Sequence, residues 1–331
     1  MQMKHASLIC TALLCLTAFP ASSTQEVEQH DPNIPPEHTL PSPGLISGAD
    51  NAEKGASLAL GPELERGVSV REIITQRRKL DAALANIPVQ RPGVMDAYVL
   101  SIALDSDLVF AREAREAGKV LGRRYNAAER TLVIAGPDGI SNEHPKGSLT
   151  ALTLALARIA EVMDADEDVL VLYTTSHGIP QGLYYHYGDT GFGILSPERM
   201  KEVFEELGIK RRVLILSACY SGVFIPAMAS DDTAILTASA ANRTSFGCAP
   251  DNDWTFFGDA LINRALRKAQ PLSAASNEAN LSIADWESRR KLFSSLPQRL
   301  IGSSAQSWLS ALEAQIPQTA TQPQGKLTDA E

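Results

Sequence analysis

The sequence has little positive charge, no long apolar run and few cysteines. It carries 30 Lys and Arg against 39 Asp and Glu, for a formal net charge of −9 over 331 residues. This balance argues against a nucleic-acid-binding protein, which needs a basic face. No apolar run reaches the ~20 residues of a membrane-spanning helix, so we expect no stable span in the mature protein. With 44% hydrophobic and 21% charged residues, the chain instead has the composition of a globular protein.

The first residues have the pattern of a secretory signal. Lys4 precedes an apolar stretch over 6–19, and Ala21 and Ser23 then stand at the two small-residue positions that a signal peptidase prefers. We therefore expect residues 1–23 to be removed and the mature protein to be periplasmic or secreted. An uncleaved membrane anchor is the alternative.

Composition divides the mature chain into segments. Residues 24–66 are rich in Pro, Gly and Ser, which predicts a disordered tether without a core of its own. A charged helical extension is expected over 67–90, and a disordered tail, rich in Gln, Thr and Pro, over 317–331. Residues 91–316 are predicted to form one domain, and we expect a chain that begins near Arg91 to fold.

Within this domain, short apolar runs alternate with helical patterns. Because strands that alternate with helices form a mostly parallel sheet covered on both faces, the sequence predicts a single α/β domain. A small β-hairpin is expected over 183–193, turning at 188–191. The predicted strands are 97–104, 131–136, 168–175, 212–218 and 233–239, and the predicted helices include 107–125, one that begins after Ser148 and one from Pro197 to Gly208.

Two of the predicted strands end in reactive side chains. His177 follows the strand 168–175, and Cys219 follows the strand 212–218. Ligands of an open parallel sheet bind beyond the carboxyl ends of its strands, so we expect the two side chains to meet there. A thiol beside an imidazole is a nucleophile with its base, and Gly178 lets the backbone approach a substrate closely.

The same part of the sequence also has residues for a disulfide, a zinc site or a serine hydrolase. A disulfide between Cys219 and Cys248 would silence the nucleophile, and export makes that bond chemically possible. A zinc site formed by His177, His186, Cys219 and Cys248 is disfavoured because the sequence has no close ligand pair such as C-x-x-C. We expect no metal and no cofactor. A serine hydrolase is poorly supported because Ser221 lacks the G-x-S-x-G frame.

These residues resemble a known family. "TSHG" after one apolar strand and "SACYSG" after the next are similar to the catalytic motifs of the legumain-type cysteine peptidases of the caspase-like clan. The segment 238–261, "ASAANRTSFGCAPDNDWTFFGDAL", is similar to the family's segment downstream of the nucleophile. The resemblance covers about residues 95–270 and implies a caspase-like α/β fold with thiol-dependent peptide cleavage.

The resemblance also implies roles for single residues. It makes Cys219 the nucleophile and His177 the general acid and base, with the backbone N–H groups of Gly178 and Cys219 as the oxyanion hole. It implies cleavage after Asn or Asp, although Tyr220 stands where legumains have an acidic pocket residue. The expected residues of the substrate pocket are Asp259, Tyr220, Ser239 and Arg112.

Three functions follow from this pattern. The first is an exported cysteine endopeptidase that takes a peptide or protein substrate. The second is a transpeptidase, because the same thioester can pass to an amine instead of water. The third is a catalytically silent binding domain in which Cys219 is oxidised.

Overall fold

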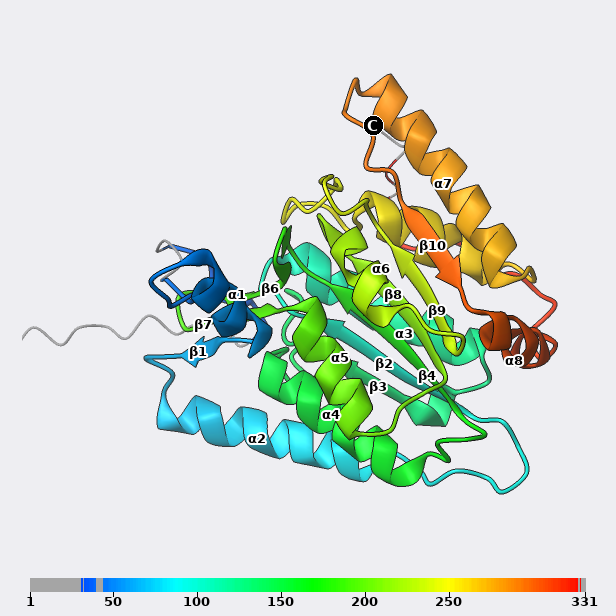
Figure 1. Cartoon of the computed structure of the whole chain (residues 1–331), viewed down its shortest axis with the longest axis horizontal. Coiled ribbons are helices and arrows are strands. Elements are labelled where there is room, and N and C mark those ends of the chain that lie inside the picture. The colour runs from blue at the N-terminus through cyan, green and yellow to red at the C-terminus, as the bar shows by residue number, and fades with distance from the viewer. Residues whose placement is uncertain (1–30, 32, 40–43, 327, 329–331) are drawn as a thin grey trace, which may run out of the picture. The chain divides into compact units, whose positions relative to one another are not determined.

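A computed structural model describes residues 31, 33–39, 44–326 and 328 of the chain (Figure 1). The predicted signal peptide, 1–23, lies outside these residues. The chain divides into two units, Met1–Asp31 and Pro32–Glu331, and all the described helices and strands belong to the second. None of the described helices is both long and apolar enough to cross a membrane.

A six-stranded sheet forms the centre of the second unit. Its strand order is β10-β9-β8-β4-β2-β3, and all neighbours are parallel except the pair β9 and β10. The mostly parallel α/β sheet predicted from the alternating pattern is therefore confirmed. The strands are β2 (Ala97–Ala103), β3 (Thr131–Ile134), β4 (Val169–Thr175), β8 (Arg212–Ser217), β9 (Thr233–Thr237) and β10 (Gln298–Ile301).

Both faces of the central part of this sheet are buried, because the strands β2, β4, β8 and β9 are largely apolar. Successive side chains of β2 and β4 point to opposite faces, so Leu100 and Leu172 join one hydrophobic cluster while Val99 and Val171 join another. One face is covered by α2 (Val70–Ala85), α4 (Leu149–Val162) and α5 (Pro197–Glu206), and the other by α3 (Leu108–Arg124), α7 (Leu272–Arg289) and α8 (Ser303–Glu313) (Figure 1).

Two of the predicted helix starts are confirmed by their caps. The side chain of Ser148 accepts the N–H of Ala151 at the start of α4, and Ser196 accepts the N–H of Arg199 at the start of α5, where Pro197 takes the first turn. The remaining short helical segments are η1 (Ala128–Arg130), η2 (Ser221–Phe224), α6 (Ile225–Met228), η3 (Gly258–Arg264) and η4 (Ala265–Arg267).

A second, antiparallel sheet begins beside the end of β4. Its strand order is β1-β7-β6-β5, formed by β1 (Glu63–Glu65), β7 (Gly191–Leu195), β6 (Gly182–Tyr187) and β5 (Gly178–Ile179). The pairing of β6 with β7 confirms the hairpin predicted over 183–193.

The N-terminal segments differ from the prediction. Part of the predicted tether is structured: α1 (Asn51–Ala59) is capped by Asp50, and β1 pairs with β7. Proline-rich composition indicated no core here, and α1 indeed buries no residue, but β7 supplies β1 with a pairing partner that composition does not reveal. The helix α2 is part of the domain, since its Leu80 lies buried in the core.

The C-terminal tail also has partners. Trp254 donates its ring N–H to the carbonyl oxygen of Gln324 at 2.9 Å, and Arg123 donates to that of Thr319 at 2.8 Å. Residues of the predicted disordered tail therefore lie along the domain. Side chains of the domain donate hydrogen bonds to the backbone carbonyl oxygens of the tail and hold it there.

Candidate active site

His177 and Cys219 are brought together by adjacent parallel strands. β4 and β8 pair with Thr175 opposite Ser217, and the two reactive residues follow these positions at equal distance along the chain. The two strand ends are in van der Waals contact, because a Cβ built on Gly178 would lie 1.9 Å from the carbonyl oxygen of Cys219. Only glycine fits at that position, which explains why the histidine is followed directly by a glycine.

A carboxylate orients the imidazole of His177. Its Nε2 lies 3.2 Å from Oδ2 of Asp107, and its ring meets the ring of Phe110 edge to face at a centroid distance of 5.0 Å. Asp107 stands at the N-cap position of α3, but its side chain makes no cap hydrogen bond and turns to the histidine instead.

Asp107 is a site residue that the sequence analysis missed. The pattern from residue 107 predicts the start of a helix, and α3 confirms it. However, Asp107 also follows β2, the neighbour of β4 in the sheet, so it lies at the same carboxyl edge as His177. The strand-end rule that located the other two residues would have located this one as well.

The thiol of Cys219 lies against a loop that leads away from β9. The backbone N–H of Ser245 donates to its Sγ at 3.2 Å. The next residue, Tyr220, takes a left-handed backbone conformation with φ 57°, and its N–H donates to the carbonyl oxygen of Arg243 at 2.8 Å. Such a conformation is costly for a residue with a side chain and is typical of a sharp turn at a functional site. Both Cys219 and Cys248 are free thiols in the structure.

The surroundings favour a thiolate on Cys219 and a proton on His177. A hydrogen bond with Cys248, opposed by burial and aided by Ser245, lowers the pKa of Cys219. The pKa of Cys248 is correspondingly raised, because it retains the proton that it shares with Cys219. Burial acts to lower the pKa of His177, but the bond to Asp107 and the nearby negative charges outweigh it, and the net pKa is raised. The lowered thiol pKa and the raised imidazole pKa both favour an ion pair.

A buried carboxylate joins the strands that carry the site. Glu113 of α3 is fully buried and accepts hydrogen bonds from Thr175 at 2.8 Å and from Ser217 at 2.9 Å, the last residues of β4 and β8. It also accepts the hydroxyl of Tyr173 and the backbone N–H of Thr255. This anchor, which sequence reasoning did not identify, holds both strand ends immediately before the reactive residues.

Comparison with known proteins finds one family match, over the segment that carries the site. Residues 148–291, which include both His177 and Cys219, match the Peptidase C13 family. The chain is therefore a cysteine-type peptidase, which implies a peptide or protein substrate.

The other comparisons add a structural neighbour. The chain is similar to the crystal structure of Caspase-1 from Spodoptera frugiperda, with 15% identity and a TM-score of 0.44 over 65% of this chain and 92% of that chain. No curated protein sequence matches the chain.

The four expected pocket residues have different surroundings in the structure. Tyr220 adjoins the nucleophile, and Ser239, fully buried, donates to the carbonyl oxygen of Ala218 at 3.2 Å. Arg112 lies 3.5 Å from a carboxylate oxygen of Asp253, within the loop that contains Cys248.

Asp259 has partners of its own. It is fully buried in η3, and its carboxylate contacts Arg264 at 3.1 Å and accepts the side-chain amide of Asn263 at 2.9 Å. The carboxylate also accepts the backbone N–H of Thr328 at 2.8 Å, and its role in the substrate pocket stays a prediction.

The zinc set considered from the sequence is not assembled. Among the described residues, the groups of His, Cys, Asp and Glu that come within ligand distance are His38, Asp105 and His186, and Asp105, Asp107 and His177. Neither contains a cysteine. His186 lies instead in a stack with His38, whose ring centroid is 3.4 Å away.

Proposed function

We propose that the chain is an exported cysteine endopeptidase that cleaves peptide bonds with Cys219 and His177. The observation that carries this proposal is the placement of both residues at the ends of paired parallel strands, with Asp107 bonded to the imidazole. The lowered pKa of Cys219 supports a thiolate nucleophile.

The reaction follows from these positions. The Sγ of Cys219 attacks the carbonyl carbon of the scissile bond, and the N–H groups of Gly178 and Cys219 stabilise the oxyanion. His177, held by Asp107, gives its proton to the departing amine, and the C–N bond breaks to leave a thioester on Cys219. His177 then takes a proton from a water molecule that attacks the thioester, and the C–S bond breaks to release the acid product and restore the Cys219 thiolate beside a protonated His177.

Specificity and location are parts of the same proposal. The resemblance to legumains supports cleavage after Asn or Asp, with Tyr220, Ser239, Arg112 and Asp259 around the side chain of that residue. The signal-like pattern of residues 1–23 supports export to the periplasm or the medium. N-terminal sequencing of exported protein tests this, and we expect the mature chain to begin at Thr24.

A positional-scanning peptide library tests the chemistry. We expect wild-type protein to hydrolyse peptides with Asn or Asp before the cut, and Cys219→Ala to lose at least about 10³-fold in kcat/KM because the nucleophile is gone. The matched variant Cys248→Ala still hydrolyses peptides and is labelled by a thiol-directed inhibitor at Cys219. Activity that survives in Cys219→Ala would overturn the assignment of the nucleophile.

The same assay separates hydrolysis from acyl transfer. With an added amine, an endopeptidase gives the acid product, whereas a transpeptidase gives the new amide, and mass spectrometry distinguishes the two. A protein that cleaves nothing in the library while both thiols remain reactive would instead support a silent binding domain.

A further inference from the structure

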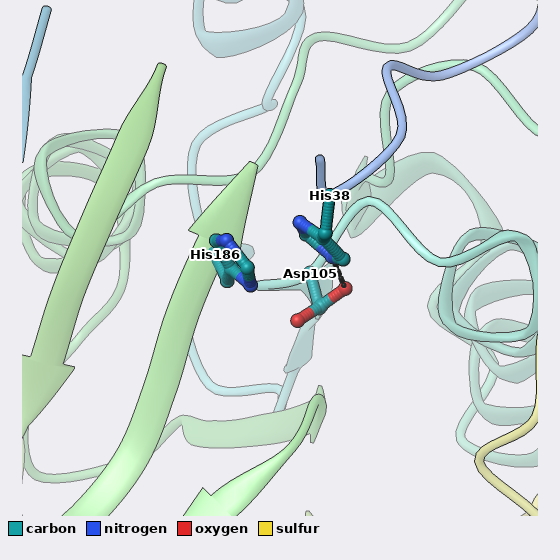
Figure 2. Close-up of side chains that lie close together, drawn as sticks. All are labelled: His38, Asp105 and His186. Carbon is teal, nitrogen blue, oxygen red and sulfur yellow. Dashed lines mark hydrogen bonds and ion pairs between the residues drawn. The ribbon is translucent and has the colours of Figure 1, made fainter. Parts of the chain in front are cut away.

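Two histidines and a carboxylate meet beside the active site (Figure 2). Asp105 follows β2, His186 lies in β6, and His38 comes from the segment 33–39. The ring of His38 lies between the other two: it stacks on His186 with an interplanar angle of 15°, and its Nε2 is 3.0 Å from Oδ1 of Asp105.

The main chain fixes two of these residues in place. The N–H of Ser106 donates to the carbonyl oxygen of His186 at 3.0 Å, and the N–H of His186 donates to that of Leu104 at 2.9 Å. These bonds flank Asp105 on both sides. The main chain that carries Asp105 and His186 is therefore held in place before any ligand arrives, while their side chains keep their torsional freedom.

Two buried polar atoms of this cluster have no partner among the described residues. These are Oδ2 of Asp105 and Nε2 of His186. The side chain of Asp105 has no exposed surface. A buried carboxylate oxygen without a hydrogen-bond partner is destabilising, so it indicates a missing ligand.

The hydrogen bonds of His38 also indicate a missing ligand. Its Nδ1 lies 3.3 Å from the carbonyl oxygen of Gly188, which only an N–H satisfies. With that tautomer, Nε2 presents a lone pair to the carboxylate of Asp105 at 3.0 Å, and two acceptors in that position repel each other. Either a second proton or a cation must lie between them. A ring whose other nitrogen donates to a backbone carbonyl is the usual arrangement of a metal-binding histidine.

We propose that His38, Asp105 and His186 bind a zinc ion. Two imidazole nitrogens and one carboxylate oxygen are a ligand set that zinc prefers, with a water molecule in the fourth position. The three ligand atoms lie within 4.8 Å of one another, and a tetrahedral site needs them about 3.3 Å apart. Because a metal lies in the plane of each ligating ring, the stacked ring of His186 turns about its side-chain torsions when zinc binds.

Such a site ties the N-terminal segment to the catalytic edge. Segment 33–39 is already bonded there by the carbonyl oxygen of Pro36, which accepts the hydroxyl of Ser106 at 3.0 Å, and by the N–H of Thr39, which donates to Asp189 at 3.0 Å. Asp105 is two residues from Asp107, the partner of His177. Zinc therefore fastens this segment beside the residue that orients the catalytic histidine.

Calorimetric titration of zinc chloride into the full-length mature chain carrying Cys219→Ala tests the site, and this background removes zinc binding by the reactive thiol. We expect one site per chain, and we expect His38→Ala and His186→Ala each to weaken it by at least about 100-fold. The matched control His144→Ala, a histidine outside the cluster, binds as the parent does. Since the background lacks the nucleophile, the result does not depend on the proposed peptidase reaction.

Cobalt(II) provides a second readout in the wild-type protein. A tetrahedral absorption spectrum without a thiolate charge-transfer band, lost in His38→Ala, supports the site. No zinc binding by the parent, or equal affinity in the parent and His38→Ala, would overturn it. His38 lies outside both sheets and its side chain is 20% exposed, so its removal leaves the fold intact even where His186→Ala does not.

Discussion

Asp107 decides in which form His177 works. The imidazole is partly buried, and burial alone would favour its neutral form, yet the bond to Asp107 raises its pKa above the ordinary value. Asp107 does not touch the thiol, so it is a positioning residue: it fixes the ring and leaves Nδ1 for the proton that is exchanged with substrate.

We expect Asp107→Asn to lower kcat by about 10²-fold, because an oriented and charged general acid is lost. The imidazolium is the active form, so activity falls as pH rises through the pKa of His177. Without the carboxylate that pKa is lower, and the alkaline limb of the pH profile moves to lower pH. A pH series of kcat/KM measures this, with Asp166→Asn, an exposed carboxylate paired with Lys210, as the control. An alkaline limb that stays in place would contradict the role of Asp107.

Cys248 is predicted to tune the nucleophile. A hydrogen bond with Cys248 is the largest influence that lowers the pKa of Cys219. In Cys248→Ala the thiolate loses that bond, so its pKa rises. The alkylation rate of Cys219 by iodoacetamide increases as the thiol ionises, and we expect the midpoint of this increase to move up by about one pH unit. Ser230→Ala, distant from the thiol, is the control, and an unchanged midpoint would show that Cys248 does not stabilise the thiolate.

At the scale of elements, sequence patterns predicted those strands and helices whose residue pattern is strong within the segment itself. The apolar runs of β4 and β8 are long and continuous, so the sheet and the meeting of His177 with Cys219 followed from the strand-end rule. β10 was missed because this short edge strand is half exposed and its order comes from antiparallel pairing with β9. The role of Glu113 was also missed. The residue pattern of α3 predicts a helix but does not indicate that the hydroxyl groups of three strand residues donate to this carboxylate.

Glu113→Gln tests how the strand ends are held. The amide keeps one acceptor oxygen but turns an N–H₂ group toward hydroxyl and backbone donors, so buried bonds to a charged acceptor are lost. We expect the free energy of unfolding to fall by about 2–3 kcal/mol and kcat to fall with it, because Thr175 and Ser217 lose their anchor. Urea unfolding measures the stability. The exposed Glu205→Gln of α5 should change it by no more than about 0.5 kcal/mol, and an equal effect in both variants would show that Glu113 is not an anchor.

At the scale of the whole molecule, composition set the domain boundary too late in the chain. Six of the sixteen residues of α2 are charged, and this composition predicted an extension that is dispensable for folding. The structure instead buries Leu80 at 7% exposure and Ile87 at 5%, both in the cluster that covers one face of the sheet. The sequence of a helix with only a narrow apolar stripe gives little indication that the helix is buried. The helix that α2 packs against, α4, is also distant along the chain.

A chain that begins at Arg91 is therefore expected to be unstable, contrary to the prediction from sequence. Removing two buried aliphatic side chains costs about 3–6 kcal/mol, at about 1.5–3 kcal/mol each, and exposes the apolar face of α4. That is a large part of the 5–15 kcal/mol that typically stabilises a domain, so soluble yield should fall sharply. A chain that begins at Val68 keeps α2 while losing α1 and β1, and urea unfolding of the two chains separates the contributions. Equal stability of both would show that α2 only lies on the domain and that its boundary is at Arg91 after all.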